Sequence, residues 1–351
     1  MRMDAIAARE LAAKILHSAG ASPDHAAIVA DCLVSADLRG VGSHGISRLM
    51  IYCERFDSRL VNPQPNFTFP REKNAAILMD ADNGPGAVAG VAAMDKAIEK
   101  AKVHGMASCA VAHANHFGIA AYYGMRTLEH DMIGLAFTNA PANVAPWGGK
   151  KTYFGTNPIC FTAPALTKRP IVFDAATSVV ARGKILLAEI ENQDIPEGWA
   201  LDPGGNPTTN AKTALAGSML PFAAYKGYGI AMMIEILCAM LSGSAFGPHT
   251  GELYGNKNRQ QDISMFFCAI DIASFTDTHD FKTRMDQMID EVKSAEKAPG
   301  VEEIFMPGEI EFCNEDYNLE HGIKVGPGVL RDLTELCKKY KLNLDPHDCL
   351  K

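Results

Sequence analysis

Three side chains that can do chemistry lie within six positions of the stretch LRGVGSHGISRLMIYCERF (residues 38–56): the hydroxyl of Ser43, the imidazole of His44 and the guanidinium of Arg48. An imidazole accepts and donates protons near neutral pH, so His44 is a candidate acid or base. A guanidinium offers two parallel N–H donors, which suits Arg48 to holding a carboxylate. If the stretch is helical, residues 44 and 48 share one face, and Tyr52 extends that face by a turn. These residue types suit a site for a small carboxylate, and a surface arginine on a helix is the common alternative for Arg48.

A second candidate imidazole, His116, follows the apolar run MASCAVAHA (106–114), which is typical of a strand. Catalytic side chains collect at strand ends and in loops of α/β proteins, so His116 is well placed for catalysis or for contact with a ligand. For a single histidine, an ordinary hydrogen-bonded role is the more common alternative. His113 and Cys109 lie close to His116 in the chain, which raises the alternative of a metal site. Because no carboxylate is adjacent in the sequence, we expect no metal there.

The composition restricts the class of protein. The 351 residues are 47% hydrophobic and 21% charged, enough for one large domain or two ordinary ones with a sizeable core. A net charge of -8 without a basic cluster argues against a nucleic-acid partner. Nine cysteines without a CxxC pair, and an N-terminus that lacks the apolar core of a signal peptide, indicate a soluble cytoplasmic protein with reduced thiols. The longest apolar run, IAMMIEILCAML (230–241), is too short for a membrane span and predicts a buried core helix.

Helical patterns dominate both ends of the chain, and short apolar runs dominate the middle. Ser22-Pro23-Asp24 signals a helix start, and a further helix is expected over residues 46–57. The segment VNPQPNFTFPREK (61–73) contains three prolines and is interpreted as a linker. Six apolar runs suit strands buried on both faces: 75–82, 106–114, 132–140, 157–164, 170–177 and 265–272. Helical patterns between several of these runs indicate an α/β fold.

One glycine-rich stretch, DADNGPGAVAG (80–90), follows a predicted strand and opens a helix, as the dinucleotide-binding turn of a Rossmann fold does. Its glycines are spaced G-x-G-x-x-x-G instead of G-x-G-x-x-G, and the next strand does not end in an acidic residue. We therefore interpret the stretch as an ordinary turn.

Seven blocks, in order along the chain, resemble a single protein family. They are LRGVGSHGISR (38–48), NHFGIAAYY (115–123), APWGGKKTYFGTNPICF (145–161), VFDAATSVVARGK (172–184), LDPGGNPTT (201–209), AAYKGYGIAMMIEIL (223–237) and MPGEIE (306–311). The pattern is similar to the type 2 malate/L-lactate dehydrogenase family, which includes ureidoglycolate and sulfolactate dehydrogenases and some imine and diketo-acid reductases. The resemblance implies an α/β fold with a non-Rossmann, mixed-sheet nucleotide-binding domain (73–307). It also implies a helical domain made from both chain ends (1–72 and 308–351), in a homodimer.

The resemblance also implies roles for individual residues. His116 and His44 match the catalytic positions, with His116 preferred as the group that moves the proton. Ser43 and Arg48 match the substrate side, which implies that Arg48 holds the substrate carboxylate while Ser43 and His44 reach the oxygen on C2. The matches to cofactor contacts are Asn139, Ala140, Asp174, Ala175, Ala176, Lys226, Pro307, Gly308 and Glu309. Two departures stand out: Ala140 replaces a serine found in many members, and Ala223-Ala224-Tyr225 replaces Gly-Gly-His.

The cofactor positions also have a physical rationale. Lys226 begins a predicted helix, where a cation and free backbone N–H groups favour an anion. The strand-end carboxylate of Asp174 could accept bonds from ribose hydroxyls, although capping a helix would explain it equally well. The turn at residues 307–309 could line the nicotinamide.

The function implied by the resemblance is hydride transfer between NAD, with NADP as the alternative, and a small 2-hydroxy or 2-keto acid. Malate/oxaloacetate is the preferred pair, while lactate, ureidoglycolate, sulfolactate and imine substrates stay open. Two other classes also stay open: a non-catalytic binding protein that kept the fold, and a metal-dependent hydrolase that uses Cys109, His113 and His116.

Overall fold

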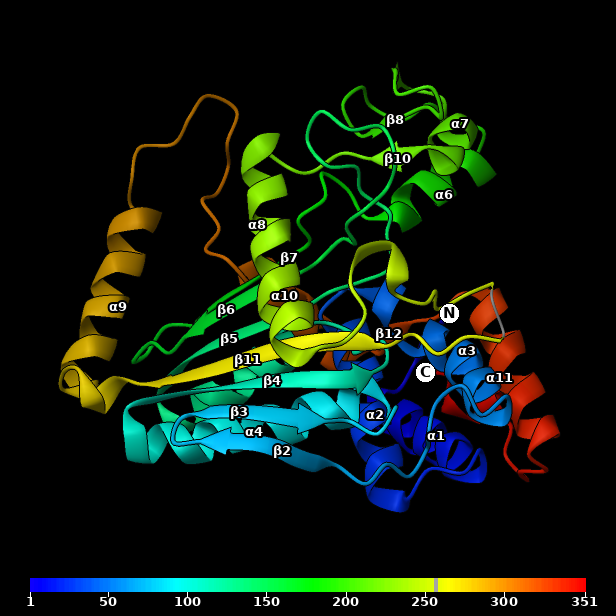
Figure 1. Cartoon of the computed structure of the whole chain (residues 1–351), viewed down its shortest axis with the longest axis horizontal. Helices are drawn as coiled ribbons and strands as arrows, with labels where there is room; N and C mark the ends of the chain where they lie inside the picture. Colours follow the sequence, from blue (N-terminus) through cyan, green and yellow to red (C-terminus); the bar gives the residue numbers. More distant parts are fainter. Residues whose placement is uncertain (256–257) are drawn as a thin grey trace.

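A seven-stranded mixed sheet forms the centre of the computed structural model, which describes residues 1–255 and 258–351 (Figure 1). Its strands, in spatial order, are β2 (Thr68–Lys73), β3 (Ala76–Asp80), β4 (Met106–Ala114), β11 (Ile263–Asp271), β5 (Met132–Thr138), β6 (Ile159–Ala163) and β7 (Ile171–Ala175). The β3–β4 pair is parallel and the other five pairs are antiparallel. The six apolar runs thus form strands as predicted, and the mixed-sheet α/β fold is confirmed.

One face of the sheet is covered by α4 (Gly86–His104), which connects β3 to β4 and packs against β4 and β11. The short α5 (Ala121–Gly124) and the 3₁₀ segment Met125–His130 extend this layer over β5. Buried aliphatic side chains of α4 and the sheet form a continuous core around Met94, Tyr123 and Phe267. This layer positions the residues at the ends of β3 and β4.

The opposite face carries α8 (Tyr225–Glu235), which continues into a π turn over Ile236–Met240. Ile234 and Cys238 are buried there against Phe137 of β5. The prediction of a fully buried helix over residues 230–241 is wrong for the single chain, because only one side of the helix meets the sheet. The exposed side carries Met232, Met233, Ile236, Met240 and Leu241, which are 37–56% exposed.

The outer strands β6 and β7 also differ from the expectation of burial on both faces. Phe161 of β6 and Phe173 of β7 pair with each other in register, and they are 36% and 40% exposed. The reason is that α8 and its π turn pack on the central strands β4, β11 and β5. The single chain therefore leaves an apolar surface beside α8.

Both chain ends pack into one helical group. A shared core joins α1 (Ala5–Ser18), α2 (Pro23–Leu38), α3 (Leu49–Asp57) and α11 (Pro327–Lys339). The strand β1 (Arg2–Met3) pairs with β12 (Ile323–Lys324), and α10 (Glu309–His321) packs on α2. Figure 1 accordingly places the two termini close together. The exact domain boundaries at residues 72 and 308 stay a prediction.

Several local features differ from the sequence-based expectations. Residues 68–73 of the expected linker form β2, an exposed edge strand, where Pro70 is tolerated because an edge position needs fewer ladder hydrogen bonds. A small three-stranded sheet, β10-β8-β9, was not expected. Its strands are β8 (Ala200–Leu201), β9 (Pro207–Thr208) and β10 (Ser218–Met219). The helices α6 (Arg182–Ile190) and α7 (Ala211–Ala216) belong to the same part of the chain. The remaining helix, α9 (Thr278–Lys293), follows β11 and lies away from the helical group in Figure 1.

Among the described residues, no helix combines the length and the hydropathy that crossing a membrane requires.

Candidate active site

The backbone around Ser43 and His44 folds as two 3₁₀ turns, Gly42–His44 and Ile46–Arg48, and not as the start of one helix over residues 46–57. The carboxylate of Asp37, on α2, explains the break between them. Its Oδ2 accepts the Ile46 N–H at 2.7 Å, and a Cβ on Gly45 would lie 2.0 Å from Oδ1. Burial raises the pKa of Asp37 to about 7. The glycine after His44 therefore allows a buried carboxyl group to hold the turn.

Arg48 folds back on this turn although it does not share a helix with His44. Arg48 Nε donates to the Ser43 carbonyl oxygen at 2.7 Å, and Ser43 Oγ lies 2.9 Å from His44 Nδ1. Arg48 Nη1 donates to Tyr254 Oη, a partner that the sequence did not indicate. Ser43, His44 and Arg48 are thus brought together by local bonds. A substrate carboxylate could take the place of the Tyr254 hydroxyl as the partner of the Arg48 guanidinium.

His116 comes from the loop after β4 and completes the group. Its Nδ1 lies 2.7 Å from Tyr52 Oη, and its ring stacks on His44 with the centroids 5.5 Å apart and the planes at 19°. The His116 N–H donates to Gln261 Oε1 at 3.1 Å. The structure therefore brings the five residues predicted for catalysis and substrate binding into one cluster, and adds Gln261 and Tyr254 to it.

Both imidazoles lie in surroundings that oppose a positive charge. Burial lowers the pKa of His44 to about 4, with Arg48 adding to the effect. Burial also lowers the pKa of His116 well below 6.5, and His44 and Arg48 lower it further. Both rings are therefore neutral at pH 7, and the stacked pair can take up one proton more readily than two. Such a pair is suited to accept a proton from an alcohol.

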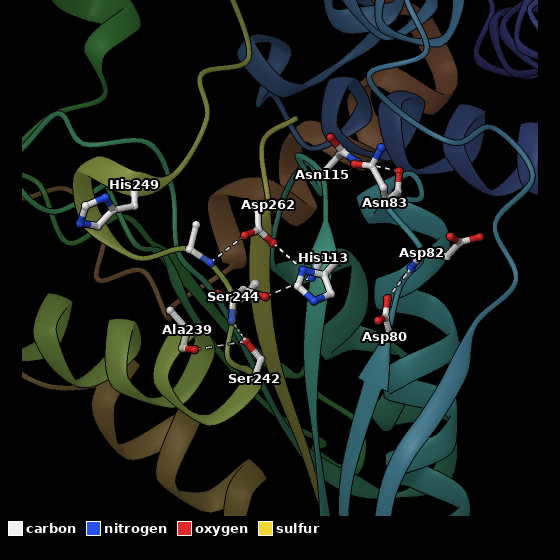
Figure 2. Close-up of polar contacts among 12 residues, drawn as sticks. Asp80, Asp82, Asn83, His113, Asn115, Ala239, Ser242, Ser244, His249 and Asp262 are labelled. Atoms are coloured by element: carbon white, nitrogen blue, oxygen red, sulfur yellow. Dashed lines mark hydrogen bonds and ion pairs between the residues drawn. The ribbon is translucent and has the colours of Figure 1, made fainter. Parts of the chain in front are cut away.

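The glycine-rich turn at residues 80–90 supports His116, which agrees with its interpretation as a structural turn. Asn115 Nδ2 donates to the carbonyl oxygens of Asn83 and Gly84, at 2.9 and 3.0 Å. Figure 2 shows Asn115 facing Asn83. A Cβ on Gly86 would lie 2.1 Å from the Asn115 carbonyl oxygen, so the glycine lets the start of α4 touch the backbone before His116.

The three residues of the metal-site alternative are held by different partners. Cys109 is buried within β4, His116 meets Tyr52, and His113 Nδ1 lies 2.8 Å from Asp262 Oδ1, as Figure 2 shows. Within residues 1–255 and 258–351, no group of three or more His, Cys, Asp or Glu side chains is arranged to hold a metal ion. The structure therefore does not assemble this cluster.

The segments predicted to contact a cofactor lie side by side. The Ala140 N–H donates to Asn157 Oδ1 at 3.1 Å, and Thr177 Oγ1 donates to the Asn157 carbonyl oxygen at 3.2 Å. The Phe222 N–H then donates to the Thr177 carbonyl oxygen at 3.0 Å. These bonds link the segments that carry residues 139–140, 174–176 and the approach to Lys226.

Comparison with known proteins decides the family. The family model for malate/L-lactate dehydrogenase matches residues 3–334. The chain belongs to this family. It is 38% identical over 334 residues to a malate dehydrogenase of Pyrococcus abyssi, covering 93% of this chain and 91% of the relative. It is 33% identical over 310 residues to the ureidoglycolate dehydrogenase (NAD(+)) of Escherichia coli strain K12, covering 88% of each chain.

The fold agrees with that membership. The solved structure of the sulfolactate dehydrogenase from Methanocaldococcus jannaschii superposes with a TM-score of 0.94 at 37% identity and covers 100% of both chains. The resemblance drawn from the seven blocks is therefore confirmed, and the chain is a dehydrogenase of the kind that acts on 2-hydroxy acids.

Two of the residues predicted to contact the cofactor, Asn139 and Glu309, already use their side chains in hydrogen bonds within the protein. Asn139 uses both amide hydrogens, on Glu235 Oε1 and the Ala245 carbonyl oxygen, and its Oδ1 accepts the Ser264 N–H at 2.9 Å. The Glu309 carboxylate is held by Lys293 at 2.5 Å and by the Met306 N–H at 2.9 Å. Both side chains therefore hold neighbouring segments of the protein in place.

Other cofactor positions remain accessible. Asp174, at the end of β7, accepts the Ala121 N–H at 2.7 Å, and burial raises the pKa of its carboxyl group to about 6. The structure thus shows the helix-capping contact, and the bond to a ribose stays a prediction. Lys226 is exposed in the first turn of α8. Pro307 accepts the Val172 N–H at 3.0 Å, and a Cβ on Gly308 would lie 2.6 Å from the Val172 carbonyl oxygen, so this turn runs along β7.

Proposed function

We propose that this dehydrogenase oxidises malate to oxaloacetate, or runs the reverse reduction, with a nicotinamide dinucleotide. The observation that carries the proposal is the cluster in which Arg48, His44 and His116 meet. It combines a carboxylate-binding group with neutral imidazoles, as oxidation of a 2-hydroxy acid requires. Lactate, sulfolactate, ureidoglycolate and imine substrates carry the same core chemistry and are the alternatives for the test.

In the proposed reaction, Arg48 holds the carboxylate next to C2, exchanging its bond to Tyr254 for two parallel bonds to the substrate. Ser43 and His44 then orient the oxygen on C2, and His116 accepts the hydroxyl proton. A bound nicotinamide would supply the acceptor for the hydride that leaves C2. Tyr52 stabilises the protonated ring through its bond to His116 Nδ1. The lowered pKa of His116 keeps the ring neutral at pH 7, which is the form that can accept a proton.

The start of α8 and the end of β7 carry groups that suit a dinucleotide. Lys226, exposed at the start of α8, would hold the pyrophosphate, and the carboxylate of Asp174, at the end of β7, would accept ribose hydroxyls. An acidic group disfavours a 2′-phosphate, so we propose NAD as the cofactor and keep NADP as the alternative. Ala175, Ala176 and the turn at residues 307–309 would line this surface through their backbone.

The test is a panel of 2-keto acids, with pyrroline-type cyclic imines included, assayed by oxidation of NADH and of NADPH. We expect oxaloacetate with NADH to give the highest kcat/KM. A tenfold preference for sulfopyruvate or pyruvate would reassign the substrate, and a preference for NADPH would reassign the cofactor. Quenched NADH fluorescence with no turnover on any substrate would indicate the non-catalytic binding protein instead.

We further propose a cytoplasmic homodimer. All nine cysteines are unpaired, which supports a reducing compartment. The apolar surface formed by the exposed side of α8 together with Phe161 and Phe173 supports the dimer, because a single chain rarely leaves so many large apolar side chains in contact with water.

A further inference from the structure

The side chain of Glu235 is a buried carboxylate that the proposed reaction does not use. Glu235 is the last residue of α8 and is 3% exposed. Moving a carboxylate out of water is costly unless hydrogen bonds within the protein replace those to water. The partners of Glu235 therefore indicate why an acidic residue is kept inside the protein at this position.

Three donors from different parts of the chain meet the two oxygens of Glu235. Oε1 accepts Asn139 Nδ2–H at 3.3 Å and the Gly247 N–H at 2.9 Å, and Oε2 accepts Asn157 Nδ2–H at 2.7 Å. All three donors are uncharged. Asn139 directly follows β5, and Asn157 precedes β6 by two residues. One side chain thus joins the end of α8 to the segments at the ends of two neighbouring strands.

The orientations of the two asparagine amides are fixed by backbone N–H groups. Asn139 Oδ1 accepts the Ser264 N–H at 2.9 Å, and Asn157 Oδ1 accepts the Ala140 N–H at 3.1 Å. Each amide must therefore direct its Nδ2 towards Glu235. A glutamine in place of Glu235 would carry one oxygen and one NH₂ group, and one of its ends would set a donor against a donor. The geometry thus requires an acceptor at both ends of this side chain, which a carboxylate supplies.

Asn157 is held in an unusual backbone conformation. It is 0% exposed, and its Nδ2 also donates to the Ala231 carbonyl oxygen of α8 at 3.1 Å. Its φ angle of 23° is unfavourable for a residue with a Cβ atom and persists only where the surrounding structure imposes it. The bond to Glu235 is part of that surrounding structure, and Asn157 in turn holds the backbone of Ala140.

The elements that Glu235 joins are the ones proposed to meet the cofactor. Lys226 lies in the first turn of α8, the same helix that ends at Glu235. The backbone hydrogen bonds of a helix fix the distance between its two ends. Holding Glu235 against Asn139 and Asn157 therefore also holds Lys226 relative to residues 139–140.

We propose that Glu235 is the positioning residue of the cofactor surface, and that its carboxylate holds α8, with Lys226, against the segment of residues 139–140. Because it is buried, Glu235 acts through Asn139 and Asn157 and not by touching the dinucleotide. The inference rests on the proposed function in assigning the cofactor to this surface. The hydrogen bonds of Glu235 do not depend on that assignment.

The first test is Glu235→Gln, which keeps the size of the side chain but turns one acceptor into a donor. We expect the Kd of NADH, measured by fluorescence titration, to rise about tenfold or more, the effect of losing a hydrogen bond to a charged group. KM for oxaloacetate at saturating NADH should stay within twofold, because the substrate cluster lies on other elements. An unchanged Kd, or equal rises in Kd and KM, would remove Glu235 from this role.

Ile234→Ala is the matched control for a loss of stability alone. Ile234 precedes Glu235 in α8 and is 0% exposed, packed against Phe137. Truncating a buried isoleucine should lower the melting temperature at least as much as Glu235→Gln does. We expect its Kd for NADH to stay within twofold of the wild-type value. If Kd rises in both variants in proportion to the loss of melting temperature, Glu235 has a structural role only and the proposal is overturned.

An exchange of the two partners tests whether Glu235 acts through Asn157. Asn157→Asp alone sets two carboxylates against each other and should weaken NADH binding as Glu235→Gln does. In the double variant, the introduced glutamine can donate to the introduced aspartate, which still accepts the Ala140 N–H, and the bond to the Ala231 carbonyl oxygen is lost. We expect the double variant to bind NADH at least about fivefold more tightly than either single variant. Losses that simply multiply would show that the two residues do not act together.

The outcomes separate this inference from the proposed function. If the wild-type protein binds neither NADH nor NADPH, the proposed function fails and the positioning role fails with it. The melting temperatures of the wild type, the two single variants and the double variant still decide in that case whether Glu235 and Asn157 act as a pair. If the wild type binds NADH and the losses of the exchange variants multiply, only the further inference fails.

Discussion

At the scale of the residue, Arg48 is the first side chain to test. Arg48→Lys keeps the positive charge but loses the two parallel donors and the reach to both Ser43 and Tyr254. We expect KM for oxaloacetate to rise ten- to a hundredfold, since a hydrogen bond to a charged group contributes about 1.5–3 kcal/mol. KM for NADH should stay within twofold. Arg126→Lys, in a surface pair with Asp95, is the matched control and should change neither constant. Equal losses for both ligands would place Arg48 outside the substrate site.

The choice between the two histidines is decided by separate substitutions. His116→Asn is expected to lower kcat about 10²–10⁴-fold, because it removes the proton acceptor. His44→Asn should cost about tenfold, because it removes one orienting group from the substrate oxygen. Steady-state kinetics of malate oxidation across pH 5–9 provides the measurement. If the larger loss and the loss of the pH-dependent limb both follow His44→Asn, the two roles are exchanged.

The depressed pKa of His116 has a consequence for the wild-type protein. A proton acceptor works in its neutral form, and lowering its pKa below 6.5 extends that form to more acidic conditions. Log kcat/KM for malate oxidation should therefore stay level as the pH falls from 8 to 6.5, and decline only below 6.5. A decline centred at pH 7 or above would show that burial, His44 and Arg48 do not control this group.

The residues of the candidate cluster were predictable because Ser43, His44, Arg48 and Tyr52 lie close together in the sequence and His116 follows a strand. Asp37, Tyr254 and Gln261 were not, because each acts across a distance in sequence that carries no pattern. The Gln261–His116 bond spans 145 residues. A glutamine, a tyrosine or a helical aspartate is common, and only the packing of α2, β4 and β11 gives these three their contacts.

At the scale of the element, the strands were predictable and their surroundings were not. Apolar runs of strand length identify β3–β7 and β11 because burial selects those residues. The same hydrophobicity in residues 230–241 does not reveal which layer covers it, so a helix exposed on one side was expected to be buried. Likewise, the prolines before β3 indicated a linker, although an edge strand accommodates them equally well.

The backbone just before α8 is strained because two alanines adopt positive φ angles there. Ala223 and Ala224 have φ values of 47° and 59°, which are unfavourable for a residue with a Cβ atom and favourable for glycine. Ala224→Gly should raise the free energy of unfolding by about 0.5–1 kcal/mol, since relief of roughly 1–2 kcal/mol exceeds the entropy that glycine adds to the unfolded chain. Urea unfolding at fixed protein concentration measures it. Ala92→Gly, within regular α4, should have the opposite sign, and a destabilised Ala224→Gly would contradict the argument.

At the scale of the whole molecule, β11 connects the two halves of the site. Gln261, just before the strand, holds His116, and Ser264, within it, exchanges bonds with Asn139. The proposed catalytic cluster depends on helices from the N-terminal end of the chain, and the proposed cofactor surface depends on β5, β7 and α8. A central strand that bonds to both would, in the proposed reaction, fix the distance between substrate and cofactor, which hydride transfer requires.

The apolar surface beside α8 leads to the last prediction. Obligate homodimers bury about 2,000–5,000 Å² of largely apolar surface, and the apolar side chains exposed on α8 and at Phe161 and Phe173 would form one part of such an interface. Sedimentation velocity of the 37.8 kDa chain should show a dimer at micromolar concentration. Ile236→Asp places an unpaired charge on this surface and should give monomers, because burying the carboxylate costs several kcal/mol and each 1.4 kcal/mol weakens association tenfold. Val103→Asp makes the same kind of change at an exposed position on α4 and should remain dimeric. A monomeric wild-type protein, or a dimer that only Val103→Asp dissociates, would place the interface elsewhere.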